Sequence, residues 1–209
     1  TSFLTLCSVF TAPVVENFDD GDVWVSGIGF GNTDDTISQC WGRDPGNGGF
    51  FWGVRTGTTG SGSTGPSQDV SGNGNYLFTE GSNGVADDSA FLYSPEIDLS
   101  NITDPYVTFS YHMFGGDIDS LTVYASNDNG FSWDTIGRIY GQQQTANTDA
   151  WLDTSFSLSA YTNDTVSIAF LNVKSTGFET DIAVDEFSIL PCIGDAGADG
   201  SEDVCRLDT

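Results

Sequence analysis

The sequence has very few basic residues. Five Lys and Arg residues stand against thirty Asp and Glu residues, which gives a net charge of −25 over 209 residues. Nucleic acids and anionic membranes need a cationic patch, so this composition argues against both as partners. Sulfated or uronic polysaccharides would also be repelled unless cations bridge them. The charge is compatible with solubility in salty water and with divalent-cation binding, and both can hold.

The chain also lacks long apolar runs and helical periodicity. No run is long enough to span a bilayer, and the opening TSFLTLCSVF lacks the cationic start and the length of a signal peptide. We therefore expect a segment cut from a longer precursor. Without a 3.6-residue apolar period in any window, an all-β fold is predicted.

Zinc ligands are scarce as well. The four cysteines form no C-x-x-C motif, and His112 is the single histidine. Disulfides are therefore favoured over a zinc site, which indicates an oxidising, extracellular compartment. Four cysteines allow three pairings, and the spacing does not choose among them.

What the sequence does contain is a series of short apolar runs separated by turn residues. In strand 106–114, Val107 and Phe109 alternate with Thr108 and Ser110, so one face should be core and the other more polar. Nine strands suit a two-sheet jelly-roll β-sandwich. The predicted strands are 15–18, 75–80, 89–95, 106–114, 120–126, 134–140, 153–159, 166–173 and 181–190.

The same pattern divides the chain into three parts. Residues 1–13 are predicted to be a lead-in, 14–190 the β-sandwich, and 191–209 a linker with the start of a following module. A glycine-rich, aromatic stretch at 40–78 is expected to be a long loop, which in a compact domain is usually functional or strongly self-packed.

The stretch SNDNGFSWDT matches the Asp-box pattern found in sialidases and many other extracellular β-proteins. Turn chemistry accounts for its positions Ser126, Asp128, Gly130 and Trp133, with Trp133 expected to fold beneath the turn. No Ser or Cys nucleophile motif accompanies His112, and the many carboxylates do not single out a glycosidase pair. We therefore expect no enzymatic activity.

The order of several segments resembles the MAM domain, an extracellular module named for meprin, the A5 antigen and a receptor phosphatase. The resemblance covers about residues 14–190, and SYHMFG followed by an apolar strand and the closing IAVDEFSI are its most specific pieces. It implies a jelly-roll sandwich without catalysis, which serves adhesion or ligand recognition in a longer protein. The tail GDAGADGSEDVCRLDT resembles the start of a repeat in large secreted surface proteins of Bacteroidota.

The resemblance also implies disulfides. Animal members usually carry four cysteines in two bridges, whereas here Asp104, Pro105 and Tyr106 occupy the place of one of them. Cys40 and Cys192 lie near expected positions, and Cys7 is left to pair with either. Cys205 is assigned to the next module.

A structural calcium ion is implied where the first acidic turn meets the closing strand. The matching positions are Asp19, Asp88 and Asp185, with Asp69 and Glu80 as further candidates. Asp185 lies in an otherwise apolar strand, where an unpaired inward carboxylate would be costly. We expect these carboxylates to converge on calcium.

Two tryptophans of the glycine-rich stretch, Trp41 and Trp52, are the candidate sugar-stacking residues. Three functions are thus weighed. They are a calcium-stabilised recognition or adhesion module that binds a protein or glycan, a carbohydrate-binding module of a polysaccharide-degrading enzyme, and a hydrolase with dispersed carboxylates.

Overall fold

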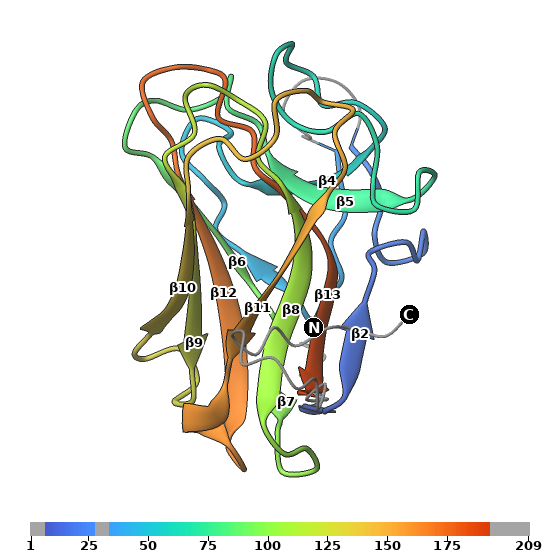
Figure 1. Ribbon diagram of the computed structural model, residues 1–209, viewed down its shortest axis with the longest axis vertical. Coiled ribbons are helices and arrows are strands. Elements are labelled where there is room, and N and C mark those ends of the chain that lie inside the picture. Colours follow the sequence, from blue (N-terminus) through green and yellow to red (C-terminus); the bar gives the residue numbers. More distant parts are fainter. Residues whose placement is uncertain (1–6, 28–33, 193–209) are drawn as a thin grey trace, which may run out of the picture.

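The computed structural model describes residues 7–27 and 34–192. Thirteen strands and one short 3-10 helix, Ser159–Tyr161, make up its regular structure. The strands form two sheets that lie face to face (Figure 1). The predicted all-β jelly-roll sandwich is confirmed.

The first sheet has seven strands and is organised around β12 (Thr165–Val173). This strand pairs antiparallel with β9 on one side and with β7 and then β6 on the other. The remaining strands extend the edges, β10 beside β9, β1 beside β7 and β3 beside β6. The bounds are β1 (Phe10–Thr11), β3 (Gly42–Arg43), β6 (Ser89–Tyr93), β7 (Ile97–Asp98), β9 (Ser120–Ser126) and β10 (Asp134–Tyr140).

The second sheet has six strands and is organised around β13 (Ala183–Pro191). It pairs with β8 on one side and with β5 and β2 on the other. A bulge at Glu186, whose φ is +50°, shifts its register between Asp185 and Ser188. The other bounds are β2 (Val14–Glu16), β4 (Trp52–Thr56), β5 (Asn75–Thr79), β8 (Pro105–His112) and β11 (Leu152–Ser157).

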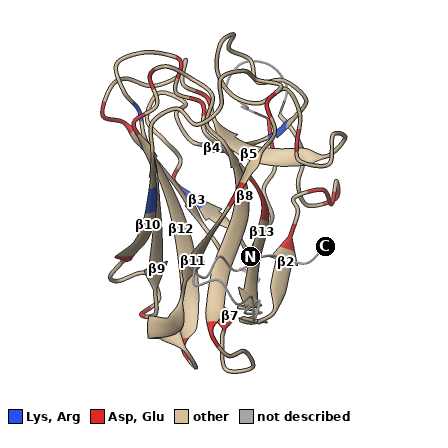
Figure 2. Cartoon of the chain, viewed as in Figure 1, with Lys and Arg blue, Asp and Glu red and all other residues tan. Residues whose placement is uncertain are grey.

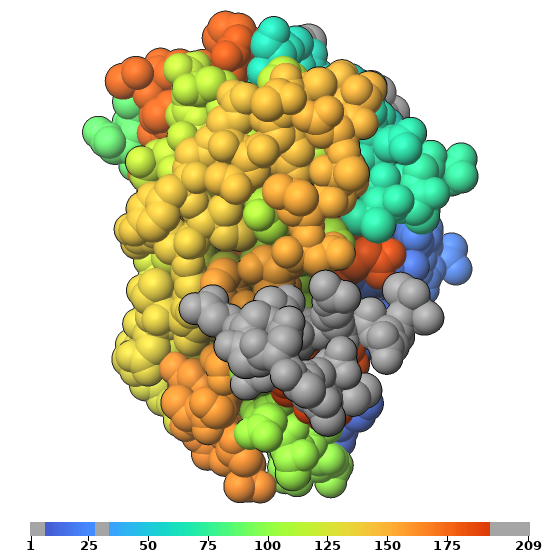
Figure 3. Space-filling view, in the orientation of Figure 1, coloured from blue at the N-terminus to red at the C-terminus, as the bar shows by residue number. Residues whose placement is uncertain are grey.

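The core lies between the sheets and follows the predicted alternation, with Val107 and Phe109 of β8 facing it. Thr108, Ser110 and His112, on the opposite face of β8, are buried as well. Loops cover that outer face, and the chain around residue 150 forms a broad part of the front surface (Figure 3). The outer face of the six-stranded sheet is therefore polar but not open.

Two segments predicted to lie outside the strands contribute to the sandwich. Phe10–Thr11 pair with Ile97–Asp98, and Cys7 is bonded to Cys40, so residues 7–13 belong to the fold rather than to a lead-in. The predicted loop at 40–78 contains β3 and β4. The many glycines in this stretch interrupt the alternation that would have predicted these strands. Trp52 of β4 nevertheless faces the core. The predicted linker and following module lie outside the described residues from 193 onward.

Acidic side chains gather mainly in the loops at both ends of the sandwich (Figure 2). The strands carry few charges, which keeps like charges apart across most of the two sheets. In the described part of the chain, no helix has the length and apolar character needed to cross a membrane.

Candidate functional site

Two buried carboxylates lie together at one end of the six-stranded sheet. Glu80 directly follows β5, and Asp181 lies two residues before β13, which pairs with β5 at Ala183 and Val184. The two side chains are 2% and 0% exposed. Burial, and then the charge of Glu80, raise the pKa of Asp181 well above its usual value.

Only half of the oxygens of this pair are satisfied. Ser61 Oγ donates to Glu80 Oε1 over 2.5 Å, and the amide of Gly81 donates to Asp181 Oδ1 over 2.7 Å. Glu80 Oε2, Asp181 Oδ2 and Thr180 Oγ1 are buried without a hydrogen-bond partner in the described residues. Leaving such oxygens unpaired is costly, and an all-oxygen set of this kind suits calcium.

Beside this pair, the backbone at Gly81 lies very close to the segment Phe178–Thr180. A Cβ at position 81 would collide with Thr180 Oγ1 and with the carbonyl of Phe178, so the close approach requires Gly81. The charge of Lys174 lowers the pKa of Asp181 in part. Its Nζ donates to the carbonyl of Gly177, so it forms no direct ion pair there.

The predicted convergence of Asp19, Asp88 and Asp185 does not occur. Each accepts a backbone amide instead, from Asn75 (2.7 Å), Val85 (2.7 Å) and Val70 (3.0 Å), respectively. Within the described ranges no group of three or more His, Cys, Asp or Glu side chains could hold a metal ion. The backbone thus satisfies carboxylates that were expected to bind calcium.

Asp185 faces away from the core between the sheets, since it pairs with Ser110 on the outer face of β8. It lies near Asp69 on the outer face of the six-stranded sheet, and Glu186 N donates to it over 2.8 Å. Burial raises its pKa to about 8. Of the five predicted metal ligands, only Glu80 belongs to the unsatisfied pair.

The Asp-box residues form a hydrogen-bonded turn between β9 and β10. Asp128 accepts from Ser132 N (2.9 Å), Ser132 Oγ (2.6 Å) and Ser126 Oγ (2.8 Å). These bonds, that of the Ser132 hydroxyl first, lower the pKa of Asp128 to about 2. The turn chemistry thus uses every Asp128 oxygen.

Trp133 is half-buried rather than covered by this turn. Gly130 packs against its indole, where a Cβ would lie 3.4 Å from the ring, and Tyr93 lies 5.6 Å away between ring centroids. The indole therefore lies beside the turn, over the outer face of the seven-stranded sheet.

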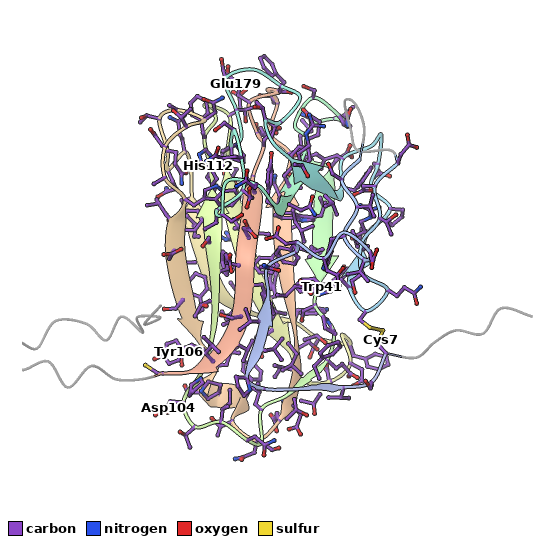
Figure 4. The ribbon with its side chains drawn as sticks, turned by 90° about the vertical axis from the view of Figure 1, so that its right-hand side faces the viewer. Cys7, Trp41, Asp104, Tyr106, His112 and Glu179 are labelled. Atoms are coloured by element: carbon purple, nitrogen blue, oxygen red, sulfur yellow. A yellow bond between two sulfur atoms is a disulfide. The ribbon has the colours of Figure 1, made fainter. Side chains whose placement is uncertain are left out.

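The candidate sugar-stacking residues Trp41 and Trp52 are buried, at 7% and 0% exposure. Trp52 Nε1 donates to the carbonyl of Ala90, and Trp41 packs edge-on against Phe187. Trp41 lies inside the fold close to the disulfide of Cys7 (Figure 4). Their burial leaves neither indole free to stack on a sugar, because Trp52 of β4 and Trp41, directly before β3, both pack in the core.

His112 (Figure 4) is fully buried. Its ring lies 5.7 Å from that of Trp151 between centroids. Burial lowers its pKa to about 4, so the ring is neutral at pH 7. No serine or cysteine in the described chain donates a hydrogen bond to it. The geometry thus offers no nucleophile and base pair at this residue.

The disulfide left open by the sequence joins Cys7 to Cys40, and Cys192 is disulfide-bonded as well. Sequence reasoning missed Asp181 and Thr180. Both stand in the run TDIAVDEF that drew attention to Asp185, but the alternation of a strand says nothing of the residues before it.

Comparisons with known proteins agree with this architecture. The family model "MAM domain, meprin/A5/mu" matches residues 30–193. The chain is 34% identical over 132 residues to MAM domain-containing glycosylphosphatidylinositol anchor protein 1 of Gallus gallus, covering 60% of this chain and 13% of that protein. It is 30% identical over 145 residues to MAM domain-containing protein 2 of Homo sapiens, and this match covers 68% of this chain and 20% of that protein.

Among solved structures, the K1 cleaved adhesin domain of Lys-gingipain from Porphyromonas gingivalis W83 is similar, with a TM-score of 0.54 and 19% identity. The match covers 86% of this chain and 98% of that one, and at this identity it shows the fold alone. The chain spans only 13% and 20% of the length of the two curated relatives.

Proposed function

Because the chain belongs to the MAM domain family, we propose that it is a non-catalytic recognition and adhesion module of a larger secreted or cell-surface protein. MAM domains are extracellular, adhesion-type modules, and the family match over 30–193 is the observation that carries the proposal. The Cys7–Cys40 disulfide suits an oxidising compartment. The expected partners are a protein or glycan ligand and neighbouring modules of the same chain.

The proposed setting is a multi-domain surface protein of the Bacteroidota type. The tail GDAGADGSEDVCRLDT supports this setting through its resemblance to the start of a repeat in such proteins. An alternative setting is a carbohydrate-binding module appended to a polysaccharide-degrading enzyme. The module binds its target in either case and leaves any chemistry to another domain.

Calcium is proposed to stabilise the module at Glu80 and Asp181. Their unpaired oxygens and Thr180 Oγ1 are three buried oxygens toward the six to eight that calcium takes, with carbonyls and water as the further ligands. A bound cation offsets the burial of the two carboxylates and the repulsion between them, which raise the pKa of Asp181 in that order of importance. Its contribution is structural, because it ties the end of β5 to the start of β13.

The recognition role is tested with beads that carry the protein at controlled density. Their retention is measured on surfaces coated with extracellular protein or with polysaccharide, and the free protein serves as competitor. Saturable retention that the free protein abolishes is expected on at least one surface. No saturable retention on any of them, or turnover of sialosides or glucans that one carboxylate substitution abolishes, would overturn the proposal.

A further inference from the structure

The outer face of the seven-stranded sheet carries a group of aromatic side chains. Phe91, Tyr93 and Tyr124 point outward, because their strand neighbours Leu92 and Val123 are buried in the core. All three are half-buried. The rings of Phe91 and Tyr93 are parallel within 4° and lie 5.7 Å apart between centroids, and Tyr124 lies 6.4 Å from Phe91.

Small residues separate and flank these rings. Ala169 of β12 pairs with Tyr93 on one side and with Tyr124 on the other, and Gly42 pairs with Tyr93 on its far side. Adjacent strands lie about 4.8 Å apart, so the two tyrosines stand roughly 10 Å apart, and Ala169 between them is fully buried. The rings therefore cover this face as a low aromatic surface over β6, β12 and β9.

This aromatic surface ends at a hollow beside Trp133. The hollow, of about 480 Å³, is lined by Trp133 and Tyr93 together with Glu96, Asn129 and Ser167. This volume is within the range of ligand-binding pockets. The Asp128 turn holds Ser132, the neighbour of Trp133, through two hydrogen bonds. The Asp-box turn thus positions an aromatic side chain at the hollow.

We infer that this face binds a neutral glycan chain, with sugar rings packed on Trp133 and Tyr93 and hydroxyl groups bonded to Glu96, Asn129 and Ser167. The inference rests on the recognition role proposed above and names its ligand class. Flat apolar surfaces with a few polar groups beside them suit pyranose rings.

Charge decides among the other occupants. An anionic glycan would meet a chain of net charge −25 and the carboxylate of Glu96, and a second copy of this chain would bring a further −25. A neutral glycan is repelled neither by the net charge of the chain nor by Glu96. Tyr93 offers such a ligand an uncharged hydroxyl, and burial and then Asp44 raise its pKa further, to about 12.

The test is affinity electrophoresis in gels that contain barley β-glucan, xyloglucan, galactan or mannan, with polygalacturonate as the anionic polysaccharide. The wild-type chain is compared with Trp133→Ala, Tyr93→Ala and Glu96→Gln. Phe178→Ala is the matched control, because Phe178 is 50% exposed and lies outside the hollow. Thermal melts accompany every variant, and Trp133→Phe retains an aromatic ring if Trp133→Ala fails to fold.

At least one neutral polysaccharide is expected to retard the wild-type chain and Phe178→Ala equally. Truncating a central aromatic should weaken this binding about tenfold or more, and Trp133→Phe and Glu96→Gln should weaken it less. The inference is overturned if no neutral polysaccharide binds, if polygalacturonate alone binds, or if folded variants bind like wild type. It is also overturned if the wild-type chain forms a dimer in sedimentation and Tyr93→Ala abolishes that dimer, because a second copy of the chain would then occupy this face. If beads are retained on protein-coated surfaces but no polysaccharide binds, the glycan ligand is refuted while the recognition role is retained.

Discussion

Glu80 and Asp181 bury their carboxylates side by side where β5 ends and β13 begins, and each keeps one oxygen that receives no hydrogen bond within the described chain. Two like charges in a region of low polarity cannot both ionise at low cost. A proton or a cation must therefore accompany the folded state.

Calcium should raise the melting temperature of the wild-type protein. At about a hundred times its Kd, a ligand of the folded state adds roughly 2.7 kcal/mol. This corresponds to a shift on the order of 5 to 10 °C for a chain of this size. Asp181→Asn should lose the shift, whereas Asp185→Asn, which removes another buried carboxylate, should keep it. Magnesium should do much less, because it demands a tight octahedron. Equal calcium shifts in the wild type and both variants would indicate charge screening and would contradict a calcium site at Glu80 and Asp181.

The size of the calcium effect should depend on pH. The folded-state pKa of Asp181 lies well above 3.8, so in chelator its stabilisation is complete below about pH 4 and is lost as the pH rises through the raised value. Calcium replaces the proton, so the gap between melts in calcium and in chelator should widen from pH 5 to pH 8. Asp185, with a folded pKa of about 8, adds a similar loss that calcium does not correct. A calcium shift that stays constant over this range would contradict the proton competition.

Gly81→Ala should destabilise the protein and weaken its calcium response. The added methyl collides with Thr180 Oγ1 and the Phe178 carbonyl, and such overpacking costs about 1–3 kcal/mol. Gly21→Ala is the matched control, because nothing lies within 4 Å of a Cβ there. Chemical denaturation with and without calcium measures both effects. If the two variants are equally stable, the close approach at Gly81 is unimportant.

Asp128→Asn should weaken the hairpin turn in a pH-dependent way. The lowered folded pKa, about 2, means that the carboxylate contributes stability above pH 4 and loses it as the pH falls toward 2. The stability difference between wild type and variant should therefore be constant near neutral pH and shrink in acid, as followed by denaturant melts. A difference that does not change with pH would show that the charge of Asp128 plays no part in the turn.

The double variant Cys7→Ser/Cys40→Ser should melt at a lower temperature. The disulfide closes a loop of sequence separation 33, which corresponds to about 3.7 kcal/mol in the chain-entropy treatment. We expect a fall on the order of 7 to 14 °C and faster proteolysis near β1. Calorimetry measures the first effect. An unchanged melting temperature would mean that the pairing of β1 with β7 holds the segment without the disulfide.

The sequence allows most strands of this fold to be predicted, but few of the contacts that matter for the site. Alternation identifies β8 and its core face from Val107 and Phe109, because the period of a strand is local. β4 escapes prediction because glycines surround Trp52 and Val54. Glu80 and Asp181 lie about one hundred residues apart, and only the pairing of β5 with β13 brings them together. That Trp133 is half-buried and Trp41 buried likewise depends on tertiary packing around the residues that precede β10 and β3.

Isothermal titration calorimetry of calcium with the folded protein, in buffers of differing ionisation enthalpy, tests most directly the claim that a cation at Glu80 and Asp181 stabilises the module. In about 0.15 M salt, which screens exposed charges, we expect one dominant site per chain and the release of protons as calcium displaces the proton of Asp181. Asp181→Asn should abolish the site, and Asp185→Asn should leave it in place. No saturable binding, or the same isotherm for Asp181→Asn as for the wild type, would contradict the account.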